Sequence, residues 1–163
     1  MQKPLPTFIL LSLLWLLSCN SNPLDSKGYQ AFKATYDDVV ATKTAIEESH
    51  GKIKENHRSI ITVFTGMEDA TKEKSDLYDI LKAHKIIEIS YDTLITEITG
   101  LVPEFNNLEE AHSSGSISTK DLATRAQPFI NSFNQIKEKH NQKLQDAGKV
   151  MEDFKNGGYT TGK

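Results

Sequence analysis

The sequence contains little cysteine, proline and glycine: one, five and nine residues, respectively, out of 163. A single cysteine cannot form a disulfide within the chain, so burial of apolar side chains must hold the fold together. Charged residues make up 25% and hydrophobic residues 37%, which is not the composition of a disordered or low-complexity chain. The chain also lacks a basic excess, with 22 acidic residues against 19 lysines and arginines. We therefore expect one ordered domain that does not bind nucleic acid.

Sequence motifs typical of catalytic and cofactor sites are also absent. The chain has no HExxH pair, no phosphate-binding glycine loop, no CxxCH haem attachment and no GxSxG elbow. Carboxylates are numerous, but the exposed faces of amphipathic helices carry them for solvation. We predict that the chain is not an enzyme, and its motifs imply no cofactor.

The N-terminal segment has the pattern of a secretory signal peptide. One cation, Lys3, precedes an apolar run from Phe8 to Leu17, and the small residue Ser18 is followed by Cys19. The run is shorter than the ~20 apolar residues that span a bilayer as a helix. The pattern therefore predicts a cleaved leader over residues 1–18.

The tetrapeptide Leu16-Leu17-Ser18-Cys19 resembles the lipobox of bacterial lipoproteins, in which a small residue precedes the cysteine that becomes lipidated. The resemblance implies that Cys19 carries acyl chains such as palmitate and anchors the protein to a membrane of the bacterial cell envelope. Asn20 follows; in lipoproteins of the enterobacterial type this implies the outer membrane, at its periplasmic face or on the cell surface. The alternative is an ordinary secreted protein with a free cysteine, but a lone thiol in an oxidising compartment has no disulfide partner.

Three stretches of the remaining chain repeat apolar residues at three- and four-residue spacing, which predicts amphipathic helices. We expect a short polar tether over residues 19–27, helices over residues 28–156 and a loose tail over residues 157–163. No stretch has the alternation of a β-strand. The predicted fold class is all-α.

Breaks in the apolar pattern predict where each helix begins and ends. The first helix is expected to begin near Ser26 and to stop at Gly66 in a left-handed conformation. The second is expected to begin at Leu77, after a connection over residues 67–75, and to continue through Pro103. A turn over residues 113–116 separates it from the third helix. That helix has the clearest start signal, a capping box formed by Ser118 and Asp121.

Short connections make successive helices antiparallel neighbours. Three helices of about 35–40 residues would each be ~55 Å long, so the expected architecture is an elongated up-down-up three-helix bundle, coiled-coil-like in its packing. Self-association into a larger bundle stays open, because polar residues within a narrow seam often specify partners.

Histidines interrupt the apolar stripes that otherwise face the core. Counting residues along the antiparallel helices places Tyr91 and four histidines within ~15 Å of height: His50, His57, His84 and His140. His84 is expected level with residue 53, and His140 level with residue 90.

Three interpretations of these histidines remain open. They form a polar core layer that fixes helix register, a metal or haem site built from His50, His57, His84 and His140, or an element that responds to pH. A di-iron site is excluded, since its two Glu-x-x-His pairs, which end at His50 and His112, would lie ~30 Å apart along the bundle.

Two functional hypotheses follow. The first is a lipid-anchored envelope protein that acts as a non-enzymatic structural or protein-binding bundle. Its partners would be the membrane, through Cys19, and another envelope protein or a second copy of itself. The alternative is a metal- or haem-binding envelope protein that uses the histidine cluster.

Overall fold

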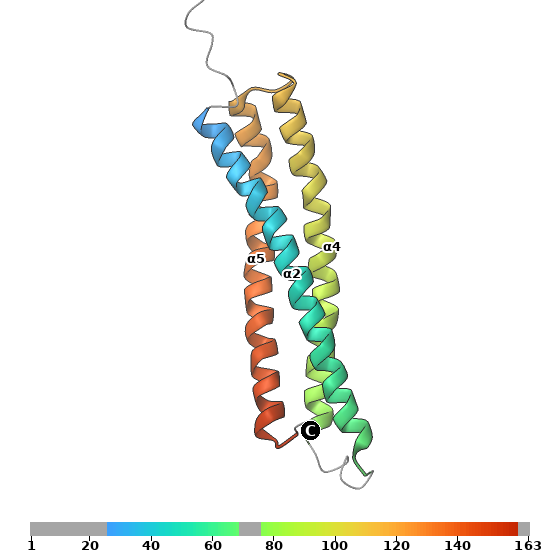
Figure 1. Ribbon diagram of the computed structural model, residues 1–163. Helices are drawn as coiled ribbons and strands as arrows, with labels where there is room; N and C mark the ends of the chain where they lie inside the picture. Colours follow the sequence, from blue (N-terminus) through green and yellow to red (C-terminus); the bar gives the residue numbers. More distant parts are fainter. Residues whose placement is uncertain (1–25, 69–75, 160–163) are drawn as a thin grey trace, which may run out of the picture.

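Three long α-helices make up the protein in a computed structural model that describes residues 26–68 and 76–159. Helix α2 spans Lys27–Gly66, α4 spans Leu77–Ser113 and α5 spans Thr119–Asn156. Successive helices run antiparallel, so α2 and α5 are parallel to each other, and all three pack together side by side (Figure 1). The predicted all-α, up-down-up three-helix bundle is confirmed. None of the helices in the described residues is long and apolar enough to cross a membrane.

The predicted leader, Cys19 and most of the tether lie in residues 1–25, outside the described residues. The same holds for residues 160–163, which form most of the predicted tail. The lipid anchor therefore stays a prediction from the sequence.

Side-chain caps start α2 and α5 at the predicted residues. The Ser26 hydroxyl accepts a hydrogen bond from the Tyr29 amide. At α5, the Ser118 hydroxyl accepts from the Asp121 amide at 3.1 Å, and the Ser118 amide donates to the Asp121 carboxylate at 3.4 Å. These bonds satisfy amides that have no partner within the helix. The hydrogen bonds from Ser118 also hold the pKa of Asp121 below its usual value.

The predicted left-handed end at Gly66 is wrong. Helix α2 ends because the next residue, Met67, turns into an extended conformation with φ −80° and ψ 149°. Positive φ occurs instead at Gly115 (75°) and Gly158 (76°), which are the positions where the chain leaves α4 and α5. A glycine near a helix end thus marked the end correctly but not its geometry.

Both interior prolines are accommodated within continuous helices. Helix α4 continues through Pro103, as predicted, and α5 continues through Pro128. Each proline removes one backbone donor from its helix. Between them the rings of Phe105 and Phe129 pack at 6.3 Å, so apolar contact across the two helices supports the weakened turns.

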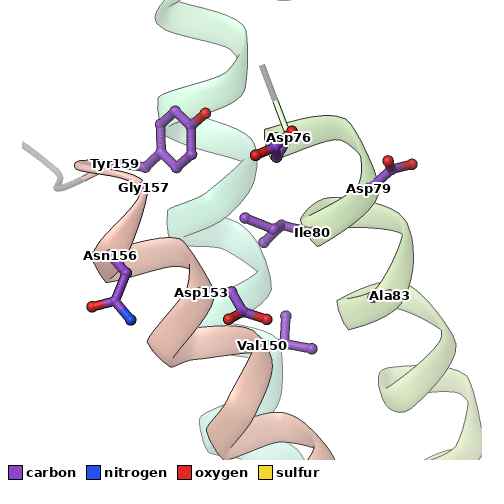
Figure 2. A pocket seen from close by; sticks show the side chains of 9 residues that line it. All are labelled: Asp76, Asp79, Ile80, Ala83, Val150, Asp153, Asn156, Gly157 and Tyr159. Carbon is purple, nitrogen blue, oxygen red and sulfur yellow. The ribbon is translucent and has the colours of Figure 1, made fainter.

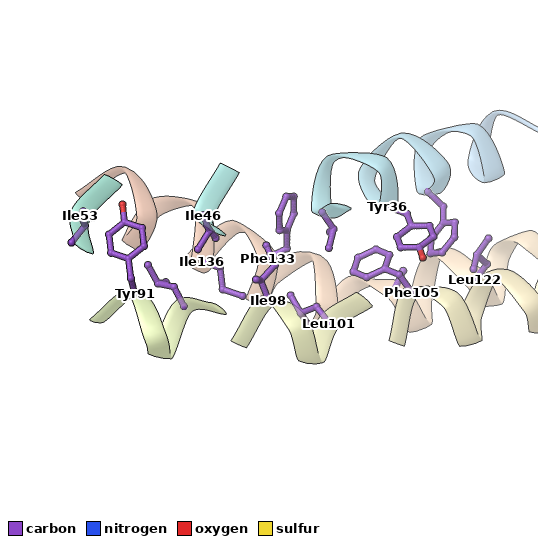
Figure 3. Close-up of a cluster of buried hydrophobic side chains, with 14 of the residues drawn as sticks. Tyr36, Ile46, Ile53, Tyr91, Ile98, Leu101, Phe105, Leu122, Phe133 and Ile136 are labelled. Carbon is purple, nitrogen blue, oxygen red and sulfur yellow. The ribbon is translucent and has the colours of Figure 1, made fainter. Parts of the chain in front are cut away.

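The core consists of two apolar clusters of unequal size. The larger contains most of the buried residues of all three helices, and Figure 3 shows Tyr36 packed beside Phe105 toward the end of the cluster that holds Leu122. Their rings stack at 5.7 Å, and the Tyr36 hydroxyl donates to Asn106 at 2.7 Å. The smaller cluster, built on Ile60, Leu77 and Phe154, closes the other end of the bundle.

Candidate functional site

Four of the five histidines are buried among the three helices: His50, His84, His112 and His140. His57 is partly buried. The four candidate metal ligands are divided between two layers, while His112 lies near the end of the bundle where α5 begins. We call the layer of His50 and His140 the middle layer and the layer of His57 and His84 the lower layer. The contacts of His112 form the upper layer.

The middle layer is built around Tyr91, whose side chain is fully buried. His50 stacks on one side of Tyr91, with ring centroids 6.0 Å apart and planes at 11°. His140 meets the same ring edge-on at 5.7 Å, and its Nε2 lies 3.3 Å from the Ser49 hydroxyl. Burial raises the pKa of Tyr91 to about 12, with a small opposing effect of Ser49. Burial also lowers the pKa of His140, so both groups are neutral at pH 7.

The lower layer is the stacked pair His57 and His84. Their ring centroids are 5.5 Å apart, with planes at 23°. Neither ring nitrogen of His84 has a hydrogen-bond partner among the described residues. Burial, followed by repulsion from His57, lowers the pKa of His84 to about 4. Such a ring is held uncharged at neutral pH.

Glu88 borders the lower layer and contacts both His57 and Lys85. Its Oε2 lies 3.8 Å from Nε2 of His57 and 3.2 Å from Nζ of Lys85. Burial of Glu88 opposes ionisation, but Lys85 and His57 outweigh it and lower the pKa of Glu88. Burial nevertheless dominates for His57, whose pKa is lowered. The layer therefore holds one carboxylate between a lysine and two neutral imidazoles.

The upper layer joins all three helices through His112. Its ring stacks on Tyr29 at 5.1 Å and 11°, and its Nε2 lies 3.0 Å from the Thr119 hydroxyl. The Tyr29 hydroxyl in turn donates to Glu109 at 2.9 Å. The Glu109/His112 pair is therefore used for contacts between helices. The sequence offered no signal for this, because His112 stands at an apolar position like the other histidines.

The predicted heights of the histidines are correct to about one helical turn. His140 packs against Tyr91, one residue from the expected level. His84 packs against His57 rather than residue 53. That shift of four residues corresponds to ~6 Å along α2. Because of this shift, His57 and His84 form a layer of their own below His50 and His140, where the sequence predicted one group of four histidines.

The histidines do not converge as metal ligands would. Within residues 26–68 and 76–159, no group of three or more histidine, cysteine, aspartate or glutamate side chains could hold a metal ion. His50 and His140 lie about Tyr91, whereas His57 and His84 stack face to face. Stacked rings point their nitrogens away from a shared centre, while zinc needs nitrogens at ~2.0–2.1 Å from one point.

A cleft of about 560 Å³ opens at the end of the bundle where α4 begins and α5 ends. Figure 2 shows the carboxylates of Asp76, Asp79 and Asp153 around it, with Ile80 and Val150 between the helices. Tyr159 closes one side. A Cβ on Gly157 would lie 2.3 Å from this tyrosine ring, so the ring occupies the space that any other residue would fill.

Exposed apolar side chains gather near the same end of the bundle. Six large hydrophobic residues are exposed in the described residues, and four of them lie in the second half of α2 or the first half of α4: Ile61 (39%), Tyr78 (60%), Ile86 (55%) and Ile89 (54%). Ile61, Tyr78 and Ile86 line a shallow groove of about 420 Å³, flanked by Lys82 and Lys85. The other two are Val40, in the first half of α2, and Leu144, on α5. This surface was not predicted, because single apolar residues on the outer face of a helix leave the inward stripe of the sequence unchanged.

Comparison with protein-family models, with curated proteins and with solved structures finds no match to this chain.

Proposed function

We propose that this chain is a lipid-anchored protein of the bacterial cell envelope, and that its three-helix bundle acts as a non-enzymatic protein-binding module. The lipid would be attached at Cys19, and the membrane would be the outer one, at its periplasmic face or on the cell surface. The observation that carries the binding role is the gathering of Ile61, Tyr78, Ile86 and Ile89 on one part of the surface. Exposed apolar side chains grouped in this way are typical of protein-interaction surfaces.

The geometry of the bundle supports this division of roles. The chain enters α2 at Ser26, at one end of the bundle, whereas Tyr78 stands beside the start of α4 at the other end (Figure 1). Ser26 follows Cys19 by seven positions, and a chain extends at most ~3.5 Å per residue, so the tether could reach ~25 Å. An anchor at one end would leave the exposed apolar surface accessible to proteins of the same membrane.

The histidine layers support a structural role for the core rather than a reactive one. His140 in the middle layer and His84 in the lower layer interrupt apolar packing, and burial lowers the pKa of both, which keeps them neutral at pH 7. Polar groups at such positions fix the register of helices, because any sliding would bury them against apolar neighbours. A fixed helix register keeps the exposed apolar residues of α2 and α4 in one arrangement, which favours binding of one partner.

The anchor is tested by metabolic labelling of the full chain with palmitate. The wild-type protein should take up label, and Cys19→Ala should abolish it and leave an uncleaved precursor. Ser21→Ala, two residues away, is the matched control and should be labelled normally. Equal labelling of Cys19→Ala and wild type would show that the anchor is not at this cysteine.

The binding role is tested by photo-crosslinking in intact cells. A photoreactive phenylalanine analogue in place of Tyr78 should give discrete protein adducts. The same analogue in place of Val40, which is exposed on another part of α2, should give few. Similar adduct patterns from both positions would remove the basis for a binding surface at this end.

A further inference from the structure

Ile89 lies on the side of α4 that faces away from the core. Its side chain is 54% exposed, and Ile86, three residues earlier, is 55% exposed. Residues three and four apart are neighbours on a helix surface. Ile86 and Ile89 thus form an apolar ridge, which we call the α4 ridge. A ridge of two isoleucines is narrow, so a single helix of a partner is wide enough to cover it.

Charges of opposite sign lie on either side of Ile89 along the helix. Lys85 precedes it by four residues and Asp92 follows it by three, so the two stand seven residues apart on one edge of the α4 ridge. Their side chains are 51% and 63% exposed. Thr93 stands seven residues after Ile86 and occupies the opposite edge. One edge is therefore cationic toward the start of α4 and anionic toward its end.

This order of charges is complementary to itself when a second α4 runs in the opposite direction. When two antiparallel helices are centred on Ile89, the residues that precede Ile89 in one copy lie opposite the residues that follow it in the other. Lys85 of each copy then faces Asp92 of the other, and Ile86 faces Thr93. A parallel two-fold pair would instead set the edge with Lys85 and Asp92 opposite the edge with Ile86 and Thr93, so neither charge would meet an opposite one. Two-fold interfaces require this reciprocity.

We propose that the α4 ridge binds the α4 ridge of a second copy of this chain, antiparallel and about a two-fold axis at Ile89. This inference rests on the proposed function, since it names the partner of the protein-binding module. Lys85 also contacts Glu88 at 3.2 Å, and Nε2 of His50 lies 3.3 Å from Asp92. Both charges keep half or more of their surface free, so pairing adds contacts without breaking these.

Anchoring in one membrane favours this small contact. A contact between two single helices buries less area than a standard interface, so it needs a high local concentration. Tethering to a shared surface supplies one. A two-fold pair on one membrane has its axis along the membrane normal. The two bundles would lie side by side along the surface, with their tethers at opposite ends of the pair.

The test is disulfide cross-linking of the full chain in its own membranes. Lys82 and Thr96 are exposed and stand seven residues before and after Ile89. Two differently tagged copies, one Lys82→Cys and one Thr96→Cys, should form a mixed disulfide on oxidation, with at least fivefold less of either homodimer. Predominant homodimers would mean a parallel pair and would overturn the proposal. Absence of cross-links above a Val40→Cys and Leu144→Cys pair would overturn it too.

Charge reversal provides the second arm. Lys85→Glu should reduce the mixed disulfide at least fivefold, and adding Asp92→Lys should restore it, because the pair of charges is then exchanged. Lys52→Glu, an exposed residue of α2, should change nothing. Failure of the double variant to recover, with helicity unchanged, would overturn the charge pairing. Maleimide labelling of the wild-type chain reports the anchor separately, because a lipidated Cys19 has no free thiol.

Discussion

His57 and His84 stack 5.5 Å apart in the gap between the two apolar clusters of the bundle. On the upper side the larger cluster reaches Ile53 and Ile87, and on the lower side the smaller cluster begins at Ile60. The lower end of the rod is thus joined to the rest through a pair of neutral imidazoles. Its stability must depend on keeping those rings uncharged.

We predict that the bundle loses stability as the pH falls from 6.5 toward 4. The pKa of His84 is lowered from 6.5 to about 4 in the folded protein, so the unfolded chain binds a proton that the folded chain excludes. The free energy of unfolding is therefore highest above pH 6.5, and it decreases as the pH falls toward 4. A shift of this size corresponds to ~3 kcal/mol by pH 4. Urea unfolding at pH 7.5, 6.0 and 5.0 measures the loss, and His57 and His140 should add to it.

The control for this pH dependence is His84→Leu, which keeps the volume and removes the titration. Its stability should change less between pH 7.5 and 5.0 than that of the wild type. An identical slope in both proteins would assign the pH dependence to other groups. Glu88 and Asp146, whose pKa values are lowered, contribute in the same direction only below about pH 4.5, where carboxylates begin to be protonated.

The inward stripe is tested by a charge at mid-height. Ile53 is almost fully buried, whereas Glu48 on the same helix is exposed. Ile53→Asp should cost several kcal/mol, because an unpaired carboxylate would be buried. Glu48→Ala should change stability by less than ~0.5 kcal/mol. Thermal unfolding of both variants decides, and similar melting temperatures would contradict the assignment of the stripe.

The sequence predicted the helices because their signals are local. Ser26 and Ser118 cap amides within three residues, and the three-four spacing of apolar residues is repeated for many turns. The height of α2 against α4 was wrong by one turn because it depended on how many residues the connection uses. Phe64 packs against Tyr78 at 6.2 Å, so the connection uses more residues than a minimal turn.

The candidate site was harder to predict because it depends on helix rotation. A height estimate could group His50, His57, His84 and His140, but only the rotation of each helix decides which rings face one another. The separation of His57 from Tyr91 follows from that rotation and from the one-turn shift. The exposed ridge at Ile89 was missed for a related reason: outward apolar residues break no pattern in the sequence.

The histidines should not bind metal or haem in a way that stabilises the fold. We expect zinc, copper and haem each to leave the melting temperature of residues 20–163 unchanged at pH 7.5, because the described residues offer no converging ligand set. A ligand that binds only the folded state at a hundred times its dissociation constant would add ~2.7 kcal/mol. A saturable rise that disappears in the His50→Ala/His140→Ala variant would instead establish the metal-binding alternative.

Two glycines of α2 should respond oppositely to alanine. A Cβ on Gly51 would meet nothing within 4 Å, so Gly51→Ala should stabilise the protein by ~0.5–1 kcal/mol through helix propensity. A Cβ on Gly28 would lie 2.7 Å from Cγ2 of Thr119. That methyl has little freedom, because the Thr119 hydroxyl lies 3.0 Å from His112. Gly28→Ala should therefore destabilise by ~1–3 kcal/mol as overpacking does.

The steric origin of that loss is tested by removing the methyl group that the new Cβ meets. Thr119→Ser keeps the hydroxyl beside His112 and deletes Cγ2, so the Gly28→Ala/Thr119→Ser variant should recover most of the stability lost by Gly28→Ala alone. The coupling energy from a double-mutant cycle, measured by urea unfolding, should be ~1 kcal/mol or more, as for residues in direct contact. Additive effects of the two substitutions would mean that α2 and α5 do not approach this closely at the upper layer.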